Sequence, residues 1–168
     1  MNILETERLF VRELDSSIDA EFVFELLNTP KFLSFIGDRG VRSVDEAAIF
    51  IDERYRASYT EHGYGLYTVE LKENATQVGL CGFVRRDTLP GPDIGFAFLP
   101  EFERQGYGFE SAEAMMKYGS ETLNFTTVLA ITSLENDASG KLLEKLGFTF
   151  KDMIENDEEK LRLYSSKS

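Results

Sequence analysis

Gly106 and Gly108 stand in a short segment, 104–110, that follows an aromatic stretch and precedes a run with helical spacing of apolar residues. A turn between a strand and a helix leaves the first N–H groups of the helix free and adds the positive end of the helix dipole. Phosphate groups bind at such turns, and glycine lets the backbone approach them without an intervening Cβ. The spacing therefore predicts a phosphate-binding turn, with a purely structural turn as the alternative. Neither the Gly-x-x-x-x-Gly-Lys-Ser/Thr loop nor the full Gly-x-Gly-x-x-Gly fingerprint is present.

A second polar cluster begins at Asn136 and includes Ser139, ahead of an amphipathic run that a glycine closes. Asparagine is a favoured helix N-cap and glycine a favoured residue after a helix C-terminus, so the pattern predicts a helix over 137–146. Ser139 offers a hydroxyl near the start of this helix. The nearest carboxylates in the sequence are Asp93 and Glu135, and either can take a proton from an ammonium group through water.

These two segments together resemble the GNAT family, the acyl-CoA-dependent N-acetyltransferases. The family's phosphate-loop pattern, Gln/Arg-x-x-Gly-x-Gly/Ala, is matched over 103–108 except at its first position, Glu103. Its later signature, Asn-x-x-Ser followed by Lys-x-Gly-Phe, is matched over 136–148. The opening segment 5–12, Glu-Thr-Glu-Arg-Leu-Phe-Val-Arg, is similar to the start of the branch that acetylates the N-terminal alanine or serine of ribosomal proteins.

The resemblance implies that acetyl-CoA is a co-substrate and that its acetyl group passes directly to a primary amine. The acceptor is then a protein N-terminal amine or a small polyamine-like or drug-like amine. A non-catalytic acyl-CoA-binding or sensing protein is the alternative from another class. The backbone of 96–98 would pair with the pantetheine arm, and the N–H groups of 104–109 would hold the pyrophosphate. The residues expected to bind CoA are Phe96, Ala97, Phe98, Arg104, Gln105, Gly106, Tyr107, Gly108, Phe109, Asn136, Ser139 and Lys141.

Two departures from the family's pattern bear on catalysis. Leu143 stands where many members carry a tyrosine that protonates the departing thiolate, so the expected acid is the hydroxyl of Ser139, one helical turn earlier. A Ser139 that only caps or packs is the alternative. Ile131 stands on the strand where some members carry a carboxylate base, which leaves Asp93 and Glu135 as the expected bases.

Hydrophobic periodicity and breakers predict the elements that must position these residues. The expected order is β-α-α-β-β-β-α-β-α-β-β, an α/β (α+β mixed) fold in which one mixed, mostly antiparallel, twisted sheet is flanked by helices in a single domain over 1–168. Ser16 and Ser17 are the expected N-cap of the first helix, which Thr29-Pro30 should end ahead of a loop. The expected strands cover 8–14, 66–72, 77–86, 93–99, 126–132, 148–153 and 160–164, and the expected helices cover 16–28, 43–63, 110–123 and 137–146.

The chain has 18 lysines and arginines against 30 aspartates and glutamates, a net charge of −12 at pH 7 over 168 residues. Such a field repels nucleic acid and anionic membranes and attracts cations, including protonated amines. Glu103 places a further negative charge beside the expected pyrophosphate and predicts modest CoA affinity. Arg104 and Lys141 would add positive charge there, with ordinary solvated side chains as the alternative.

A single cysteine, Cys81, and a single histidine, His62, exclude an internal disulfide framework and a Cys/His zinc site, so no metal is expected. Cys81 is expected to be a small packed residue, and His62 to lie at a helix C-terminus. No apolar run approaches the roughly 20 residues that span a bilayer. The opening segment contains two glutamates and lacks the apolar core of a signal peptide. The sequence predicts a soluble cytoplasmic protein, either a monomer or a homodimer.

Overall fold

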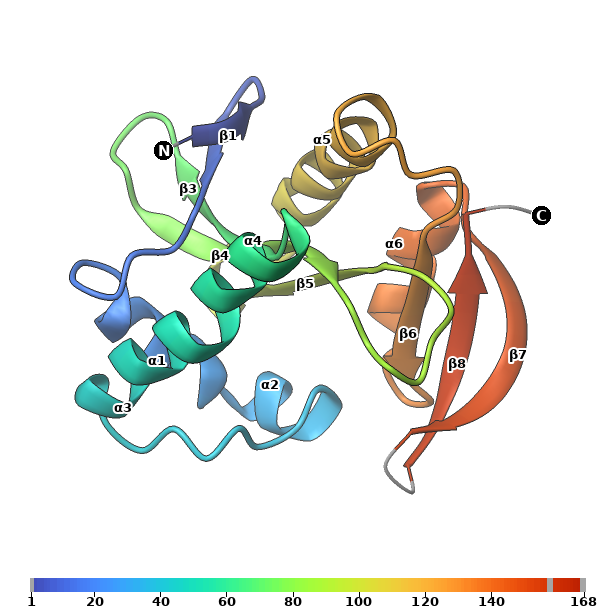
Figure 1. Cartoon of the computed structure of the whole chain (residues 1–168), viewed down its shortest axis with the longest axis horizontal. Helices are drawn as coiled ribbons and strands as arrows, with labels where there is room; N and C mark the ends of the chain where they lie inside the picture. Colours follow the sequence, from blue (N-terminus) through green and yellow to red (C-terminus); the bar gives the residue numbers. More distant parts are fainter. Residues whose placement is uncertain (1, 157–158, 167–168) are drawn as a thin grey trace.

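The computed structural model describes residues 2–156 and 159–166, and Figure 1 shows how their strands and helices are arranged. The strands are β1 (Asn2–Glu5), β2 (Leu9–Arg12), β3 (Leu66–Leu71), β4 (Gln77–Val84), β5 (Asp93–Phe98), β6 (Leu129–Ser133), β7 (Thr149–Asn156) and β8 (Glu159–Ser165). The α-helices are α1 (Ala20–Leu27), α2 (Pro30–Phe35), α3 (Val44–Phe50), α4 (Ala57–His62), α5 (Tyr107–Glu121) and α6 (Asp137–Lys145). A π-helical segment, η1 (Ile51–Arg56), joins α3 to α4, and a 3-10 turn, η2 (Pro100–Phe102), follows β5.

In the described residues the strands form one eight-stranded sheet with the order β1-β2-β3-β4-β5-β6-β8-β7. Every neighbouring pair is antiparallel except β5 and β6, which run parallel. The predicted α/β class, with one mixed, mostly antiparallel sheet flanked by helices, is confirmed. No helix of the described residues is long and apolar enough to cross a membrane.

The sheet separates two apolar cores, each closed by helices. Met115 of α5 and Leu143 of α6 belong to one core, together with Cys81 of β4. Val23 of α1 belongs to the other core, together with Leu80 of β4. Leu80 and Cys81 are neighbours in sequence and face different cores because successive side chains of a strand point to opposite sides. The sheet is thus a rigid central layer on which the site is built.

The parallel strands β5 and β6 meet at one end only. Their single registered pair is Asp93 opposite Leu129, and the N–H of Leu129 donates to the carbonyl of Pro92 at 2.9 Å. Beyond this point β5 continues along β4 while β6 turns away along β8, so the two strands diverge (Figure 1). The divergence opens the middle of the sheet at the segment predicted to hold the pantetheine arm.

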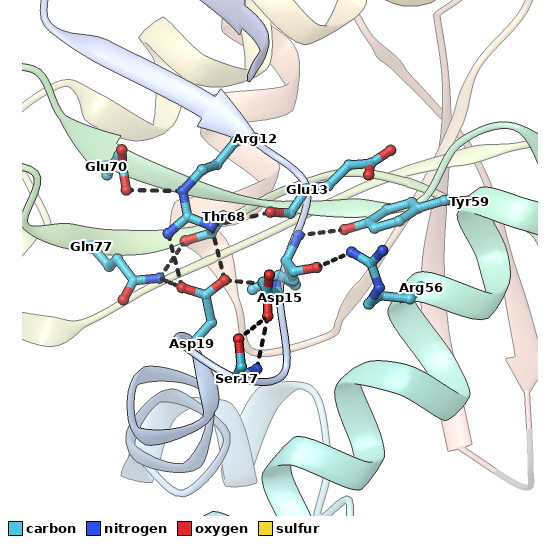
Figure 2. A network of polar contacts seen from close by, with 11 residues as sticks. Arg12, Glu13, Asp15, Ser17, Asp19, Arg56, Tyr59, Thr68, Glu70 and Gln77 are labelled. Atoms are coloured by element: carbon cyan, nitrogen blue, oxygen red, sulfur yellow. Dashed lines mark hydrogen bonds and ion pairs between the residues drawn. The ribbon is translucent and has the colours of Figure 1, made fainter. Parts of the chain in front are cut away.

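A polar network joins β2, β3 and β4 to the start of α1 (Figure 2). The Arg12 guanidinium donates to both carboxylate oxygens of Asp19, at 2.9 and 2.8 Å, and to Glu70 at 3.2 Å. The Gln77 amide donates to Asp19 at 2.8 Å and to the Thr68 hydroxyl at 3.1 Å. Because Asp19 is only 1% exposed, its charge depends on these partners, and the network fixes the N-terminal segment on the sheet.

The segment after α1 forms a short helix, α2, where a loop was expected. Pro30 is the first residue of α2, a position at which its missing N–H is not needed and its fixed φ suits a helix. The Thr29 hydroxyl caps α2 by accepting from the N–H of Phe32 at 3.3 Å. The prediction that Thr29-Pro30 ends the first helix is therefore confirmed, whereas the loop over the next residues is wrong.

The start of the chain differs from the prediction at two further points. Asp19, and not Ser16 or Ser17, is the N-cap residue of α1. The Asp15 carboxylate accepts both the N–H and the hydroxyl of Ser17, at 2.8 and 2.6 Å, and holds that segment in a turn ahead of the helix. β1 was not expected because its few residues are too short for a clear periodicity. Residues 157 and 158, between the last two expected strands, lie outside the described residues.

Candidate active site

The glycine turn has the geometry that anion binding requires. Gly106 has φ +87° and is the N-cap residue of α5, which begins three residues earlier than predicted. The first intrahelical bond runs from the N–H of Glu110 to the carbonyl of Gly106 at 3.0 Å. The N–H groups of 107–109 precede this bond and point out of the helix start. A Cβ at Gly106 would lie 3.2 Å from the Arg8 guanidinium, so both backbone and space favour glycine.

Arg8, just before β2, anchors this turn from the other end of the chain. Its guanidinium donates to the Gln105 carbonyl at 3.1 Å and to the Glu110 carboxylate at 2.7 Å, and it lies 4.5 Å above the Tyr107 ring. Glu110 also accepts from the hydroxyl of Thr6. Burial raises the pKa of Glu110, but hydrogen bonds from Thr6 and Arg8 outweigh it and lower that pKa. The sequence reasoning missed this role, although it singled out the opening segment.

The charged residues around the turn differ in what they contact. Lys31 of α2 pairs with Glu103 at 2.7 Å, so the negative charge that predicted modest CoA affinity has a cationic partner. Arg104 and Lys141 are exposed. The Gln105 side chain donates to the Glu101 carbonyl at 3.0 Å, which closes the loop on itself. The turn therefore presents backbone donors beside solvated cations.

A cavity of about 880 Å³ occupies the space between the diverging strands β5 and β6 and extends beneath the segment after α2 and the α3–α4 helix. It brings together five of the predicted site residues, which are Asp93, Phe96, Ala97, Asn136 and Ser139. Gly106 and Phe109 line a separate groove of about 600 Å³ beside Arg8. Glu135 and Lys141 are exposed and do not line either space. The predicted carboxylates are thus separated, with Asp93 inside and Glu135 outside.

Alternating hydrogen bonds turn the backbone of β5 toward the cavity. The N–H of Leu99 donates to the Val78 carbonyl of β4 at 2.9 Å, and the β4–β5 register is regular from Asp93 to Phe98. In an antiparallel ladder every second residue bonds to the same neighbour, so the N–H groups of Phe96 and Phe98 point away from β4. They point toward the side where β6 has diverged.

Asp93 is the buried carboxylate of the cavity. It is 1% exposed, and both its oxygens accept from the Arg86 guanidinium, at 3.1 and 3.2 Å. Burial raises the pKa of Asp93 to about 6, although the charge and hydrogen bonds of Arg86 lower it in part. A carboxyl group that titrates near neutral pH suits a general base.

Ser139 and Asn136 lie together at the start of α6. The Asn136 side chain accepts from the N–H of Ser139 at 3.2 Å, which confirms the capping role expected of Asn136. Ser139 is half-buried and lines the cavity, as does the buried Leu143 one turn further on. Ser139 therefore forms part of the cavity wall, one helical turn before the apolar side chain of Leu143.

Two hydroxyl groups of β6 were missed by the sequence reasoning. Thr132 and Ser133 both line the cavity, and neither of their buried hydroxyl oxygens has a hydrogen-bond partner among the described residues. Buried polar groups in proteins are generally hydrogen-bonded, so this wall is suited to a polar ligand. The only signal in the sequence was the pair of hydroxyl residues at the end of a β-branched run.

Cys81 and His62 lie where the sequence predicted. Cys81 is buried in β4, and burial raises the pKa of its thiol to about 12, so it is a packed residue and not a thiolate nucleophile. His62 is the last residue of α4, and its ring lies 5.9 Å from that of Tyr64. It also lines the cavity, which the sequence gave no reason to expect.

Residues 8–149 match the family model described as an acetyltransferase (GNAT) domain. The chain belongs to the GNAT family. The resemblance noted in the sequence is thereby confirmed, and this GNAT chain is an acyltransferase.

Several acetyltransferases match this chain over most of its length. The N-acetyltransferase YoaA of Bacillus subtilis, itself uncharacterized, is 28% identical over 147 residues, covering 87% of this chain and 82% of YoaA. The crystal structure of an acetyltransferase from Agrobacterium tumefaciens has a TM-score of 0.81 at 25% identity, covering 96% of this chain and 92% of that chain. RimL, a ribosomal-protein α-N-acetyltransferase in complex with coenzyme A, has a TM-score of 0.83 at 17% identity, covering 98% of this chain and 97% of RimL. At 17% identity, the RimL structure shows only that the two proteins share a fold.

Proposed function

We propose that this acetyltransferase uses acetyl-CoA and moves the acetyl group directly to a primary amine. The observation that carries the proposal is the cavity between β5 and β6, which places unpaired backbone donors, Asp93 and Ser139 around one space. No thiol is available for an acetyl-enzyme, because the single cysteine, Cys81, is buried with a raised pKa. Direct transfer between two bound substrates therefore fits the site.

The residues present fit acetyl-CoA. The N–H groups of Phe96 and Phe98, with Ala97 between them, would pair with the pantetheine amides, and Asn136 would add a contact from the start of α6. The N–H groups of 104–109 would hold the pyrophosphate, with Arg104 and Lys141 adding charge. The unpartnered hydroxyl groups of β6 support a polar occupant beside this strand. Such a site needs few cations, which suits a chain of net charge −12.

The catalytic steps follow from the positions of three groups. Asp93, directly or through water, takes the proton from the acceptor ammonium, whose nitrogen then attacks the thioester carbonyl. A strand N–H near Phe98 polarises that carbonyl as negative charge develops on its oxygen. Ser139 donates a hydrogen bond, directly or through water, to the departing sulfur, a group whose pKa is about 8.5 as a free thiol. The proton that the nitrogen loses as the amide forms passes to this sulfur, so that CoA leaves as a free thiol. Glu135 is a weaker candidate base because it is exposed and outside the cavity.

The acceptor is a protein N-terminal amine or a small-molecule amine, and a non-catalytic acyl-CoA sensor is the alternative from another class. One experiment separates these proposals. The protein is incubated with acetyl-CoA and a panel of amines that includes N-terminal peptides, polyamines and amino acids. Thiol release is followed colorimetrically, and acetylated products are identified by mass spectrometry. CoA binding without any acetylated product would identify a sensor and overturn the proposed transfer.

We extend the proposal to the whole chain, 1–168, as a single acetyltransferase domain. One continuous sheet order and the family match over 8–149 support it. The cytoplasmic location and the monomeric or homodimeric state stay predictions.

A further inference from the structure

The cavity gathers arginines in a chain that is otherwise acidic. Arg39, Arg54, Arg85 and Arg86 line it, and of the described residues that line it none is a lysine. They come from the segment after α2, from η1 and from the end of β4. Five carboxylates also line the cavity, so the arginines form a cationic corner within a mixed lining; these are Asp38, Glu53, Glu61, Asp93 and Glu159.

The arginines of this cluster are not equally paired. Arg86 is bound to Asp93, whereas Arg39 has no ion pair or hydrogen bond among the described residues. Arg54 lies 5.5 Å from the Phe50 ring and likewise has no carboxylate partner in the described part of the chain. Desolvation at the cavity wall lowers the pKa of Arg39, Tyr55 opposes this, and repulsion from Arg86 and Arg54 lowers it further. Arg39 and Arg54 are both exposed, and neither is held by a carboxylate of the described residues.

The carboxylates that line the cavity do not neutralise Arg39. Asp38 is engaged by Arg42, which donates to its two oxygens at 2.9 and 2.5 Å, and Asp93 is engaged by Arg86. Three other carboxylates line the cavity, on Glu53, Glu61 and Glu159. The groups that shift the pKa of Arg39 are Tyr55, Arg86 and Arg54, and none of them is a carboxylate. The cationic corner formed by Arg39 and Arg54 therefore lacks a counter-ion from the described chain.

The phosphates of CoA are expected elsewhere. Val84 pairs with Asp93, so Arg86 follows β4 at the starting end of β5. The glycine turn follows the other end of β5, and five steps along a strand at about 3.3 Å each span roughly 17 Å. An anionic group at the cationic corner must therefore belong to the second substrate.

We propose that the acceptor is a zwitterionic amine, whose carboxylate or phosphate binds Arg39 and Arg54 while its ammonium group faces Asp93. The proposal rests on the proposed amine acetylation and names its substrate class. Guanidinium groups offer paired donors that match carboxylate and phosphate geometry. A polyamine would instead bring further positive charge to Arg39, Arg54 and Arg86. The negative charge of the protein attracts the ammonium group, whereas Arg39 and Arg54 bind the anion of the same acceptor.

Matched acceptors test the proposal. The amidated peptide Ser-Ala-Asp-Ala is compared with Ser-Ala-Asn-Ala, and O-phosphoethanolamine with ethanolamine, so that each pair differs in the anion alone. Spermidine serves as the cationic reference. We expect kcat/KM to be at least about tenfold higher for the anionic member of one pair, and the pair that responds identifies carboxylate or phosphate as the recognised group. Equal or faster turnover of the neutral members, or of spermidine, would overturn the proposal while leaving amine acetylation intact.

Variants then test which residues bind the anion of the acceptor. Arg39→Gln with Arg54→Gln should reduce the anionic preference to within about twofold, whereas Lys72→Gln, which removes an exposed positive charge outside the cavity lining, should keep it. Thermal melting verifies that each variant folds. If no acceptor turns over, calorimetry of the same peptide and phosphate pairs with the CoA-bound protein decides the matter. Tighter binding of the anionic member that depends on Arg39 and Arg54 supports the proposal, and equal binding contradicts it.

Discussion

The two ends of the cavity differ in the chemical groups that they offer to a ligand. The end at 96–98, leading to the glycine turn, is made of backbone N–H groups from one continuous stretch of chain. The other end is made of side chains, with Arg39, Arg54 and Arg86 brought together from three distant segments. Backbone N–H donors depend on the fold and on the two glycines of the turn. Side-chain donors, by contrast, can be replaced by mutation without a change of fold. The backbone end therefore suits the substrate that a family shares, and the side-chain end suits the substrate that distinguishes its members.

The largest effect is expected where the two ends meet, at Ser139. Ser139→Ala removes the hydroxyl proposed to donate a hydrogen bond to the departing sulfur, so kcat at saturating acetyl-CoA should fall by about 10²–10⁴-fold. CoA affinity, measured separately by calorimetry, should change little because the backbone donors remain. A kcat within about twofold of the parent, or a loss confined to stability or CoA affinity, would leave Ser139 as part of the helix start only.

The next effect concerns the backbone end and its glycine turn. Gly106→Val forces a branched side chain into a left-handed backbone position beside Arg8, so CoA affinity should fall by about 100-fold or more. Gly147→Val is the matched control, since it imposes a comparable left-handed strain, at φ +97°, in open space outside the turn. Calorimetry on variants with a cooperative melt provides the comparison. Unchanged CoA affinity in a folded Gly106→Val protein would remove the turn from the binding site.

A smaller effect is expected in the pH profile of the side-chain end. The rate should rise with pH through about 6, the raised pKa of the buried Asp93, because the base works in its deprotonated form. Arg86 lowers this pKa in part, so Arg86→Gln should move the rise to higher pH. The stability of the fold has the opposite pH dependence. Because the pKa of Asp93 in the folded protein lies above its ordinary value of 3.8, the contribution of Asp93 to stability is greatest below pH 3.8 and is lost as the pH rises through about 6.

Two variants decide whether this pH profile belongs to Asp93. Asp93→Asn should abolish the rise near pH 6 together with most of the rate. A profile that persists in Asp93→Asn and disappears in Glu135→Gln would move the base out of the cavity. Initial rates of kcat/KM across about pH 5 to 9, with melting curves at each pH, provide the measurement.

The smallest effect tests whether side chains support the backbone end. Arg8→Gln removes the pair with Glu110 and the contact with the Gln105 carbonyl, but the Arg8 side chain is 45% exposed. Exposed pairs contribute little, so CoA affinity should fall only about threefold. Lys72→Gln is the control because the Lys72 side chain pairs with Glu5 and, among the described residues, forms no hydrogen bond or ion pair with the turn at 104–110. A loss as large as that of Gly106→Val would mean that Arg8 contacts the ligand itself.

The sequence could predict the backbone end because its requirements are local. A positive φ at Gly106 demands glycine, and the spacing of glycines beside a strand and a helix is visible in a few consecutive residues. The capping role of Asn136 was equally visible, since cap and capped N–H are three residues apart. The strands of the sheet followed from alternation and β-branched runs, which need no knowledge of distant contacts.

The side-chain end could not be predicted because nothing in the sequence joins its parts. Arg39, Arg54 and Arg86 each look like solvated surface residues until the fold brings them to one cavity. The helix α2 was missed because Pro30 was taken as a breaker, although a proline at the first helical position starts a helix as readily as it ends one. The turn before α1 was misassigned because Ser17 bonds to Asp15 instead of capping.

The π-helical segment η1 gives the protein a way to alter the cavity wall without moving the flanking helices. A π turn accommodates one more residue than an α turn, and η1 carries Arg54 and Tyr55 to the cavity wall. Loss of one residue from η1 would let α3 and α4 join as one regular α-helix. Tyr59 of α4, whose hydroxyl accepts from the N–H of Leu14 at 3.1 Å, would then keep its partner, while the side chains of η1 would be redistributed around the helix. A single codon lost here would thus change which η1 side chains face the acceptor and retain the fold.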